Sequence, residues 1–487
     1  MFLFLTGMLL LAAGYFFYGR LVEKILSPDD RKTPAMAMAD GVDYVVLPQW
    51  KNMLIQLLNI AGVGPVIGVI LGIKFGEIVF LVIPFGNMIA GATHDFLSGM
   101  MSLRNGGANL PAIIKDNLGR GYYRFFSVFS VFLLLLVVAV FINIPANLLS
   151  SLIRENSDLF WYMVVAIFAY YIVATLFPVD KIIGKIYPLF GAMLILGTAA
   201  IFAALMWNAI ENPSLLSESA AFKERMFTAE NGNPVLPVLF VTIACGIISG
   251  FHATQSPIIA RTMKSERQAR QSFYGMMIVE GYIAMIWAGA AMAIYNICPD
   301  YMLIKADTVL GKITEYFLGA NVGTVTILSV VILSITSGDT AMRSVRLSIA
   351  EMLKLNQKPL FNRVLLCIPA IAVVALLLLW SNQNAQTFKH LWNYFAWGNQ
   401  VLAASTLMAA TAWLIRSRKN FYIAIVPAMF MTFIVSCYII WVSPEHKGPY
   451  GLGLDLNLSY IIAAIFTLAV SYAVMRRAKK APKILDK

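Results

Sequence analysis

The feature that most constrains the fold of this chain is a series of long apolar segments separated by short charged gaps. A helix needs about 20 apolar residues to cross a bilayer, and barrel strands are much shorter than these runs. Because backbone groups in lipid must pair within the chain, we expect the segments to be helices. The sequence thus predicts an all-α polytopic membrane protein with about 13 transmembrane helices, near 2–18, 52–73, 77–103, 122–149, 159–177, 184–210, 235–260, 271–296, 323–343, 361–381, 388–414, 421–443 and 457–475.

The distribution of positive charge among the gaps predicts the orientation. Of the 37 Lys and Arg residues, 29 lie in or beside the odd-numbered gaps, counting the C-terminal tail, and 8 in or beside the even-numbered ones. Cytoplasmic segments carry the excess of Lys and Arg. We therefore expect an odd number of spans, with the N-terminus outside and the C-terminus in the cytoplasm. The first segment lacks a positively charged start and a cleavage site, which favours a retained helix over a signal peptide.

Composition excludes several classes of function. The chain is 59% hydrophobic and 13% charged, and its net charge of +12 lies in short gaps, which indicates membrane topology and no nucleic-acid partner. A GxxxxGK[ST] motif is absent, so we expect no ATP hydrolysis and no cofactor. The four cysteines are scattered and are interpreted as reduced packing residues. The gaps are too short for a soluble domain, so we expect a protein that is no enzyme and that meets a small-molecule substrate and membrane lipid. Nothing in the sequence indicates an oligomeric state.

Two segments are interrupted by residues that break helices. Segment 52–73 has Gly62, Gly64 and Pro65 at its centre, and segment 235–260 carries SGFHATQSP, residues 249–257. Pro removes a backbone donor, and Gly tolerates unwound geometry. The second helix would enter from the cytoplasm and the seventh from outside, which predicts a five-plus-five inverted repeat of helices 2–6 and 7–11. The expected regions are a first helix and loop (1–51), repeat one (52–210), repeat two (235–414), and two accessory helices with a basic tail (421–487).

Interrupted helices at corresponding positions of two repeats point to a transporter's binding site. The free N–H groups of the half-helices would face an anionic group of the substrate. Kinks that serve packing alone are the alternative. The candidate substrate-binding residues are Gly62, Gly64, Pro65, Ser249, Gly250, His252, Thr254 and Gln255.

Polar and ionisable residues within the spans are costly, and they often mark ion pathways. The candidates for cation or proton coupling are His94, Asp95, Glu280, Thr336, Ser337, Asp339 and Thr340, with His252 as a further relay candidate. Each has a structural alternative: Asp339 could pair with Arg343 four residues on, the histidines could be hydrogen-bonded in the core, and Glu280 could be protonated. For Asn399 and Gln400 we favour hydrogen bonds between helices over a place in the transport path. No metal site is expected beyond a sodium ion near Thr336 and Thr340.

Six motifs follow one another along the chain: DGVDYV, IAGVGPVIG, GATHDF, SGFHATQSP, SGDTAMRSVR and LWNYFAWGNQ. Together they resemble the carbon starvation protein A family of bacterial inner-membrane transporters, over residues from about 10 to 415. The resemblance implies the amino acid–polyamine–organocation (APC) superfamily with its LeuT-like core, in which the helix-nine group would lie where members often bind a cation.

The family resemblance also implies nutrient uptake during carbon starvation. Members are associated with peptide uptake, and relatives with proton-coupled pyruvate uptake. We therefore expect a secondary active transporter of peptides or a related small carboxylate, coupled to H⁺ in preference to Na⁺. A proton-coupled pyruvate symporter is the first alternative, and a passive channel or facilitator is the alternative from another class.

Overall fold

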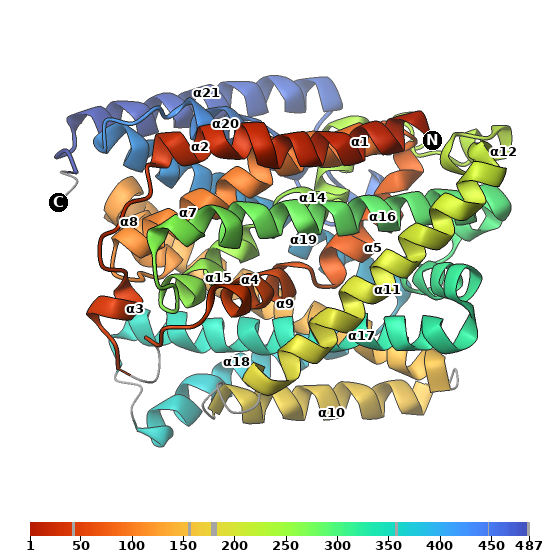
Figure 1. The fold of residues 1–487 in the computed structure, drawn as a ribbon, viewed down its shortest axis with the longest axis horizontal. Helices are drawn as coiled ribbons and strands as arrows, with labels where there is room; N and C mark the ends of the chain where they lie inside the picture. The colour runs from red at the N-terminus through yellow and green to blue at the C-terminus, as the bar shows by residue number, and fades with distance from the viewer. Residues whose placement is uncertain (41–43, 154–156, 177–182, 356–358, 447, 485–487) are drawn as a thin grey trace.

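Long helices run side by side through the whole molecule (Figure 1). The computed structural model describes residues 1–40, 44–153, 157–176, 183–355, 359–446 and 448–484, and it contains no strand within these ranges. Most helices follow the longest axis of the molecule, and α11 crosses them obliquely. The all-helical fold that the sequence predicts is confirmed.

The helices follow the order of the predicted spans, but among the described residues ten are long and apolar enough to cross a membrane, or twelve if each bent pair counts as one span, against the thirteen predicted. The first span comprises α1 (Phe2–Ala13), η1 (Gly14–Tyr18) and α2 (Gly19–Leu26), and the third comprises α6 (Val79–Gly86), η3 (Asn87–Gly91) and α7 (Ala92–Arg104). The other spans are α9 (Arg120–Ile153), α10 (Ser157–Leu176), α11 (Ile183–Glu211), α16 (Met276–Ile297) with the preceding η7 and η8 (from Glu266), α17 (Ala306–Leu353), α18 (Leu360–Ser381), α20 (Tyr422–Trp441) and α21 (Leu456–Lys480). Helix α17 is kinked at Gly319, whose backbone is not helical (φ 71°, ψ 174°). These are ten helices that are long and apolar enough to cross a membrane within the described residues.

Two further spans are bent pairs of helices, at the two segments where the sequence predicts interruptions. Gln49–Ile60 (α4) and Val63–Phe75 (α5 with η2) meet at 47°, and Val235–Thr242 (η6 and α13) and Ala244–Ala260 (α14 and α15) meet at 68°. The eleventh predicted segment, 388–414, lies in α19 (Ala385–Arg416), a 32-residue helix that is not among those apolar enough to cross a membrane by composition. Its polar residues Asn399, Gln400, Thr406 and Thr411 are fully buried, which explains how a less apolar helix is accommodated inside the bundle.

The bundle has a buried centre and an apolar rim. In the span Glu266–Ile297, 89% of the most apolar stretch is buried, whereas only 22% is buried in Leu456–Lys480. Apolar side chains that remain exposed on rim helices such as α10, α18 and α21 are the surface that lipid would cover. The two ends of the chain lie at opposite ends of the long axis (Figure 1), as an odd number of crossings requires. The inverted repeat and its domain boundaries stay a prediction.

Candidate functional site

The first helix break lies at Ala61 and Gly62, deep in the bundle. Both residues have non-helical backbone angles (φ −80°, ψ 46° and φ −77°, ψ −157°), and α5 begins at Val63. Pro65 is the third residue of α5, where a backbone N–H would have no helical partner in any case. The break therefore leaves a helix N-terminus, with the amides of Val63 and Gly64, at the centre of the bundle.

The second broken span departs from helix at two places: at Ile243 (φ −92°, ψ 7°), where its 68° bend lies, and at Ile248 and Ser249, which are extended (φ −159°, ψ 129° and φ −130°, ψ 127°). We call Ile248 and Ser249 the second break. The helix α15 begins at Gly250, so most of the SGFHATQSP motif is helical and Pro257 lies within α15. A proline bends a helix without having to end it, and here the unwound residues precede the proline by two turns. The interruption that the sequence predicts is present but is shorter, and it lies at the start of the motif.

Glycines bring the two broken spans into close contact. A Cβ placed on Gly64 would lie 2.7 Å from Cys245 Cβ, and one on Gly68 would lie 3.0 Å from the carbonyl oxygen of Thr242. On the other side of the first break, a Cβ on Gly62 would lie 3.4 Å from Ser337 Oγ of α17. The second half of the first broken span thus packs against the first half of the other, with α17 beside the first break.

Four of the predicted ionisable residues form one buried cluster. Asp95 of α7 accepts hydrogen bonds from two histidines: His94 Nδ1 lies 2.9 Å from Asp95 Oδ1, and His252 Nδ1 lies 3.2 Å from Asp95 Oδ2. His252 Nε2 lies 3.9 Å from Glu280 Oε1 of α16. All four side chains are almost completely buried. Because His252 is the third residue of α15, the cluster lies one helical turn from the second break.

Two serines that the sequence did not single out extend this cluster. Ser98 Oγ and Ser256 Oγ are 2.7 Å apart, and they bond to the carbonyl oxygens of Asp95 and His252 respectively. Each serine follows its cluster residue by three or four positions, which places it on the same helical face. That spacing is the sequence signal that could have identified them.

The predicted group on α17 is arranged differently. Arg343 Nη2 lies 3.7 Å from Asp339 Oδ1, so the ion pair foreseen as a structural alternative is present. Thr336 and Thr340 donate their hydroxyl hydrogens to carbonyl oxygens one turn back, those of Leu333 and Thr336, at 2.9 Å each. Ser337 Oγ is buried beside Gly62 and has no hydrogen-bond partner within the described part of the chain.

Several buried amides near the breaks are incompletely bonded. Gln400 donates to the carbonyl oxygen of Phe240 in α13, as expected of a residue that joins helices. The side chain of Asn399 has no partner among the described residues, and the same holds for Gln56 of α4, which no sequence pattern singled out. Gln255 Nε2 lies 3.4 Å from Thr254 Oγ1, and its Oε1 is unpartnered within the described ranges. These unused polar atoms could bind a polar ligand.

A cavity of about 900 Å³ is lined by parts of both broken spans. Its lining includes Ile67 of α5 and Val241 and Thr242 of α13, just before the bend at Ile243, but none of the eight candidate substrate-binding residues is among the described residues that line it. Its rim carries cationic and aromatic side chains, among them Arg225, Lys305, Lys389, Phe227, Phe388 and Trp441. The rim segments lie at the end of the bundle that the charge distribution predicts to be outside.

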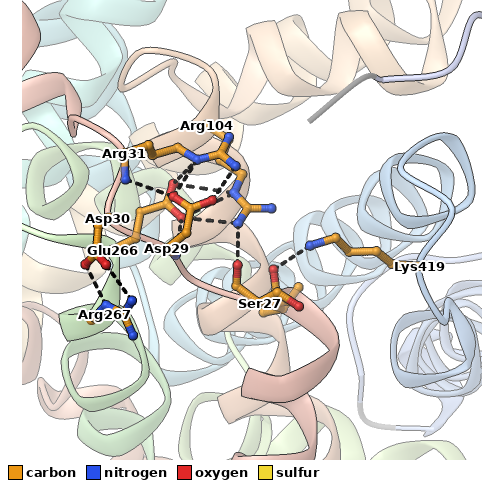
Figure 2. A network of polar contacts seen from close by, with 9 residues as sticks. Ser27, Asp29, Asp30, Arg31, Arg104, Glu266, Arg267 and Lys419 are labelled. Carbon is orange, nitrogen blue, oxygen red and sulfur yellow. Dashed lines mark hydrogen bonds and ion pairs between the residues drawn. The ribbon is translucent and has the colours of Figure 1, made fainter. Parts of the chain in front are cut away.

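Charged contacts tie the opposite end of the bundle together (Figure 2). The buried carboxylate of Glu266 meets Arg104 Nη2 at 3.2 Å and Arg31 Nε at 3.7 Å. Arg104 also donates to the carbonyl oxygen of Ser27 at 2.9 Å, and Lys419 donates to that of Leu26 at 2.6 Å. We call these residues the Glu266 network. It joins four segments: the loop after α2, the end of α7, the start of η7 and the loop between α19 and α20.

The sequence matches the family model described as "Carbon starvation protein CstA" over residues 1–173, 159–315 and 305–437. The chain belongs to the CstA family. The resemblance that the six motifs indicate is therefore confirmed.

Relatives of this CstA-family chain include a membrane protein of Haemophilus influenzae, 40% identical over 331 residues that make up 59% of this chain and 89% of that protein. The peptide transporters CstA of Helicobacter pylori and Bacillus subtilis are 26% and 27% identical, over 56% and 62% of this chain. The aligned regions make up 48% and 59% of those transporters, so the chain spans about half the length of the peptide transporters it matches.

Solved structures share the fold of this CstA-family chain. The crystal structure of a manganese transporter of Eremococcus coleocola, in complex with an aromatic bis-isothiourea substituted compound, superposes with a TM-score of 0.57 at 13% identity. The match covers 91% of this chain and 99% of that one. The relatives named for an activity and the structural neighbours are transporters and not enzymes.

Proposed function

We propose that this chain is a secondary active transporter that takes up peptides or a related small carboxylate nutrient, driven by a coupled cation. The observation that carries the proposal is the meeting of two broken helices at the centre of the bundle, with buried ionisable residues one turn away. Irregular backbone at membrane depth is tolerated only where protein buries it or a cavity reaches it, and in transporters such breaks form the substrate site.

The substrate's carboxylate would be held between the two half-helices. Both α5 and α15 begin at a break, so the positive ends of both helices lie at the centre. Ser337 Oγ, which adjoins Gly62, can donate a hydrogen bond to the carboxylate, and the unpartnered amide oxygen of Gln255 can accept one from an N–H of the substrate. The roles of Gly64, Pro65, Ser249, Gly250 and Thr254 would be to shape this backbone.

The size and chemistry of the cavity favour a peptide as the cargo. A volume of about 900 Å³ far exceeds the needs of a three-carbon acid such as pyruvate, and aromatic walls suit apolar side chains. The relatives named as peptide transporters point the same way. A metal cargo, by analogy with the manganese transporter of similar fold, has less support, since within the described residues no three His, Cys, Asp or Glu side chains are grouped to hold a metal ion.

We further propose a bacterial inner-membrane location with the cavity facing outward and the Glu266 network facing the cytoplasm. The positive charge excess on the network side supports this orientation. The carrier would then expose its site alternately to the two sides.

Uptake by the purified protein in proteoliposomes tests the function. A labelled dipeptide and labelled pyruvate would be offered side by side under an inward H⁺ or Na⁺ gradient, with and without an ionophore that collapses it. We expect gradient-dependent accumulation of the dipeptide, suppressed by the unlabelled dipeptide. Accumulation of pyruvate alone would assign the pyruvate alternative. Equilibration without accumulation under either gradient would contradict active transport and assign a facilitator.

A further inference from the structure

We infer that the coupling ion is a proton, shared between His252 Nε2 and Glu280, and that Asp95 is the positioning residue that makes this possible. The inference deepens the proposed transport function and rests on it. It selects two of the buried ionisable residues as the carrier of the proton and assigns a different task to each of the others.

The hydrogen bonds of Asp95 determine which nitrogen atom of His252 is left to exchange a proton. The Asp95 carboxylate has no hydrogen of its own when ionised, so both facing Nδ1 atoms donate their N–H to it. This fixes His252 with its Nδ1 bonded and its Nε2 directed at Glu280, at 3.9 Å. The hydrogen bond that one ring nitrogen of a histidine makes thus determines which nitrogen is free to exchange a proton.

His252 Nε2 and the Glu280 carboxylate face each other without a hydrogen between them unless the two residues hold one proton. Neither oxygen of Glu280 has a hydrogen-bond partner among the residues that the structure describes, and the side chain is fully buried. An ionised Glu280 facing a neutral Nε2 would be two acceptors with no hydrogen between them, beside the negative charge of Asp95. One proton resolves this, either on Nε2 with Glu280 ionised or on Glu280 with His252 neutral.

The surroundings of the pair contain few other ionisable groups. Those that face it are Asp95 and His94 from α7 and Cys245 from α14, and the charges acting on Asp95 and Glu280 come from the two histidines and from each other. Helix α7 packs against both α15 and α16, the two helices that carry the pair (Figure 1). Among the described residues no Lys or Arg charge acts on Glu280 or Asp95, so a single proton changes the charge of this region without compensation.

The rival cation site on α17 lies beside a cation of the protein itself. Neither oxygen of Asp339 has a hydrogen-bond partner among the described residues, but Arg343 Nη2 lies 3.7 Å from Asp339 Oδ1, and its positive charge lowers the attraction of that carboxylate for sodium. Thr336 and Thr340 are bonded within their own helix. We therefore assign Asp339 to the structure of α17 and the coupling to His252 and Glu280.

The position of His252 explains how proton and substrate would be coupled. It lies in the first turn of α15, whose free N-terminus would bind the substrate's carboxylate. With its one proton the pair is neutral overall, and without that proton it carries a negative charge that repels an anionic substrate group. Proton binding therefore favours substrate binding, and the carrier with both bound changes state more readily than the carrier with one of them. Loss of the proton to the cytoplasm then weakens the hold on the substrate.

The test compares gradient-driven accumulation with substrate exchange, in proteoliposomes that hold one labelled dipeptide. Exchange swaps labelled for unlabelled substrate and moves no net proton. We expect Glu280→Gln to lower H⁺-driven accumulation at least tenfold while exchange persists and no longer depends on pH. The wild type should lose exchange as the pH is raised and the pair gives up its proton. Retained exchange also shows that the variant is folded.

Two further variants make the result decisive. Glu351→Gln, at the exposed end of α17, makes the same chemical change away from the cluster and should behave as the wild type. Asp95→Asn should shift the pH at which exchange declines, because it releases the ring of His252. If Glu280→Gln accumulates substrate as the wild type does, or if Asp339→Asn alone abolishes accumulation, the assignment of the proton is wrong. Wild-type accumulation driven by Na⁺ alone would show that the coupling ion is not a proton, but it would leave the transport function standing. A wild type without any uptake would contradict the transport function itself.

Discussion

At the scale of single residues, one glycine sets how closely the second broken span can approach α19. A Cβ on Gly250 would lie 2.2 Å from Leu402 Cβ, 2.4 Å from the carbonyl oxygen of Asn399 and 2.5 Å from the amide nitrogen of Ala403. Two of these three neighbours are backbone atoms, which cannot rotate away as a side chain could. Glycine is therefore required at position 250 because a Cβ would clash with α19, and not because of its backbone angles.

We expect Gly250→Ala to destabilise the protein by about 1–3 kcal/mol, the usual cost of overpacking. Gly311→Ala is the matched control, because it also lies in a helix and its Cβ would meet nothing within 4 Å. The control should be neutral or more stable by up to about 1 kcal/mol, since alanine favours helix. Thermal unfolding of both variants in detergent measures the difference. Equal melting temperatures would show that α19 and α15 separate easily.

The same scale shows what could be read from the sequence about the site. His94, Asp95, His252 and Glu280 were each identifiable as costly residues inside apolar segments, but their assembly into one cluster was not. Three helices contribute to it, with His252 157 residues after Asp95, and spacing within a helix carries no information on which helices meet. By contrast, the pair of Asp339 and Arg343 was foreseeable because it lies within one helix.

At the scale of elements, α19 contacts the chain on both sides of the second break and so stabilises it. It bonds to the half before the break through Gln400 and the carbonyl oxygen of Phe240, and it packs against the half after the break at Gly250. The sequence indicated the helix and both breaks, because glycines, prolines and apolar runs are local signals. It placed the second break too late, since the extended backbone at Ile248 and Ser249 depends on neighbours that no local pattern contains.

Gln400→Met tests whether this residue joins helices or lines the path. Methionine keeps the shape of the side chain and removes the N–H donor of Gln400. We therefore expect the free energy of unfolding to fall by about 1 kcal/mol, the range for a hydrogen bond between membrane helices. The apparent KM for substrate should stay within twofold. Thr411→Val on the same helix is the control, because its hydroxyl bonds only to its own helix. A raised KM with unchanged stability would instead place Gln400 in the path.

At the scale of the whole molecule, the cavity and the Glu266 network lie at opposite ends of the same helices. The cavity reaches Phe388 at the start of α19, and Lys419 of the network follows the end of that helix. The cavity thus lies at one end and the charged contacts at the other. Beside the network, the hydrogen bond from Arg31 lowers the pKa of Asp29, and that from Arg267 lowers the pKa of Asp30. Carboxyl groups with a lowered pKa lend their stability above the ordinary carboxyl range and lose it only as the pH falls below that range, so these two carboxylates keep their charge near neutrality.

A network with fixed charge is suited to hold the cytoplasmic end closed while the buried proton pair responds to the gradient. Removing its central charge should therefore shift the population toward a state that is open to the cytoplasm and closed at the cavity. We expect Glu266→Gln to lower the rate at which an impermeant thiol reagent, added from outside, labels Thr242→Cys in the cavity wall, by fivefold or more. Cys298 is partly exposed and could itself react with the reagent. All variants would therefore be made in a protein that carries Cys298→Ser.

Arg104→Gln should shift the labelling in the same direction, and the double variant should add little, because both changes break the same buried contact. Glu351→Gln, exposed on the same side of the molecule, controls for the loss of a charge alone. Since each tenfold change in a population ratio corresponds to about 1.4 kcal/mol, the labelling rates convert directly into the free energy by which the network favours the closed cytoplasmic end. Unchanged labelling in a folded Glu266→Gln protein would mean that the network stabilises the fold equally in both states and does not act as a gate.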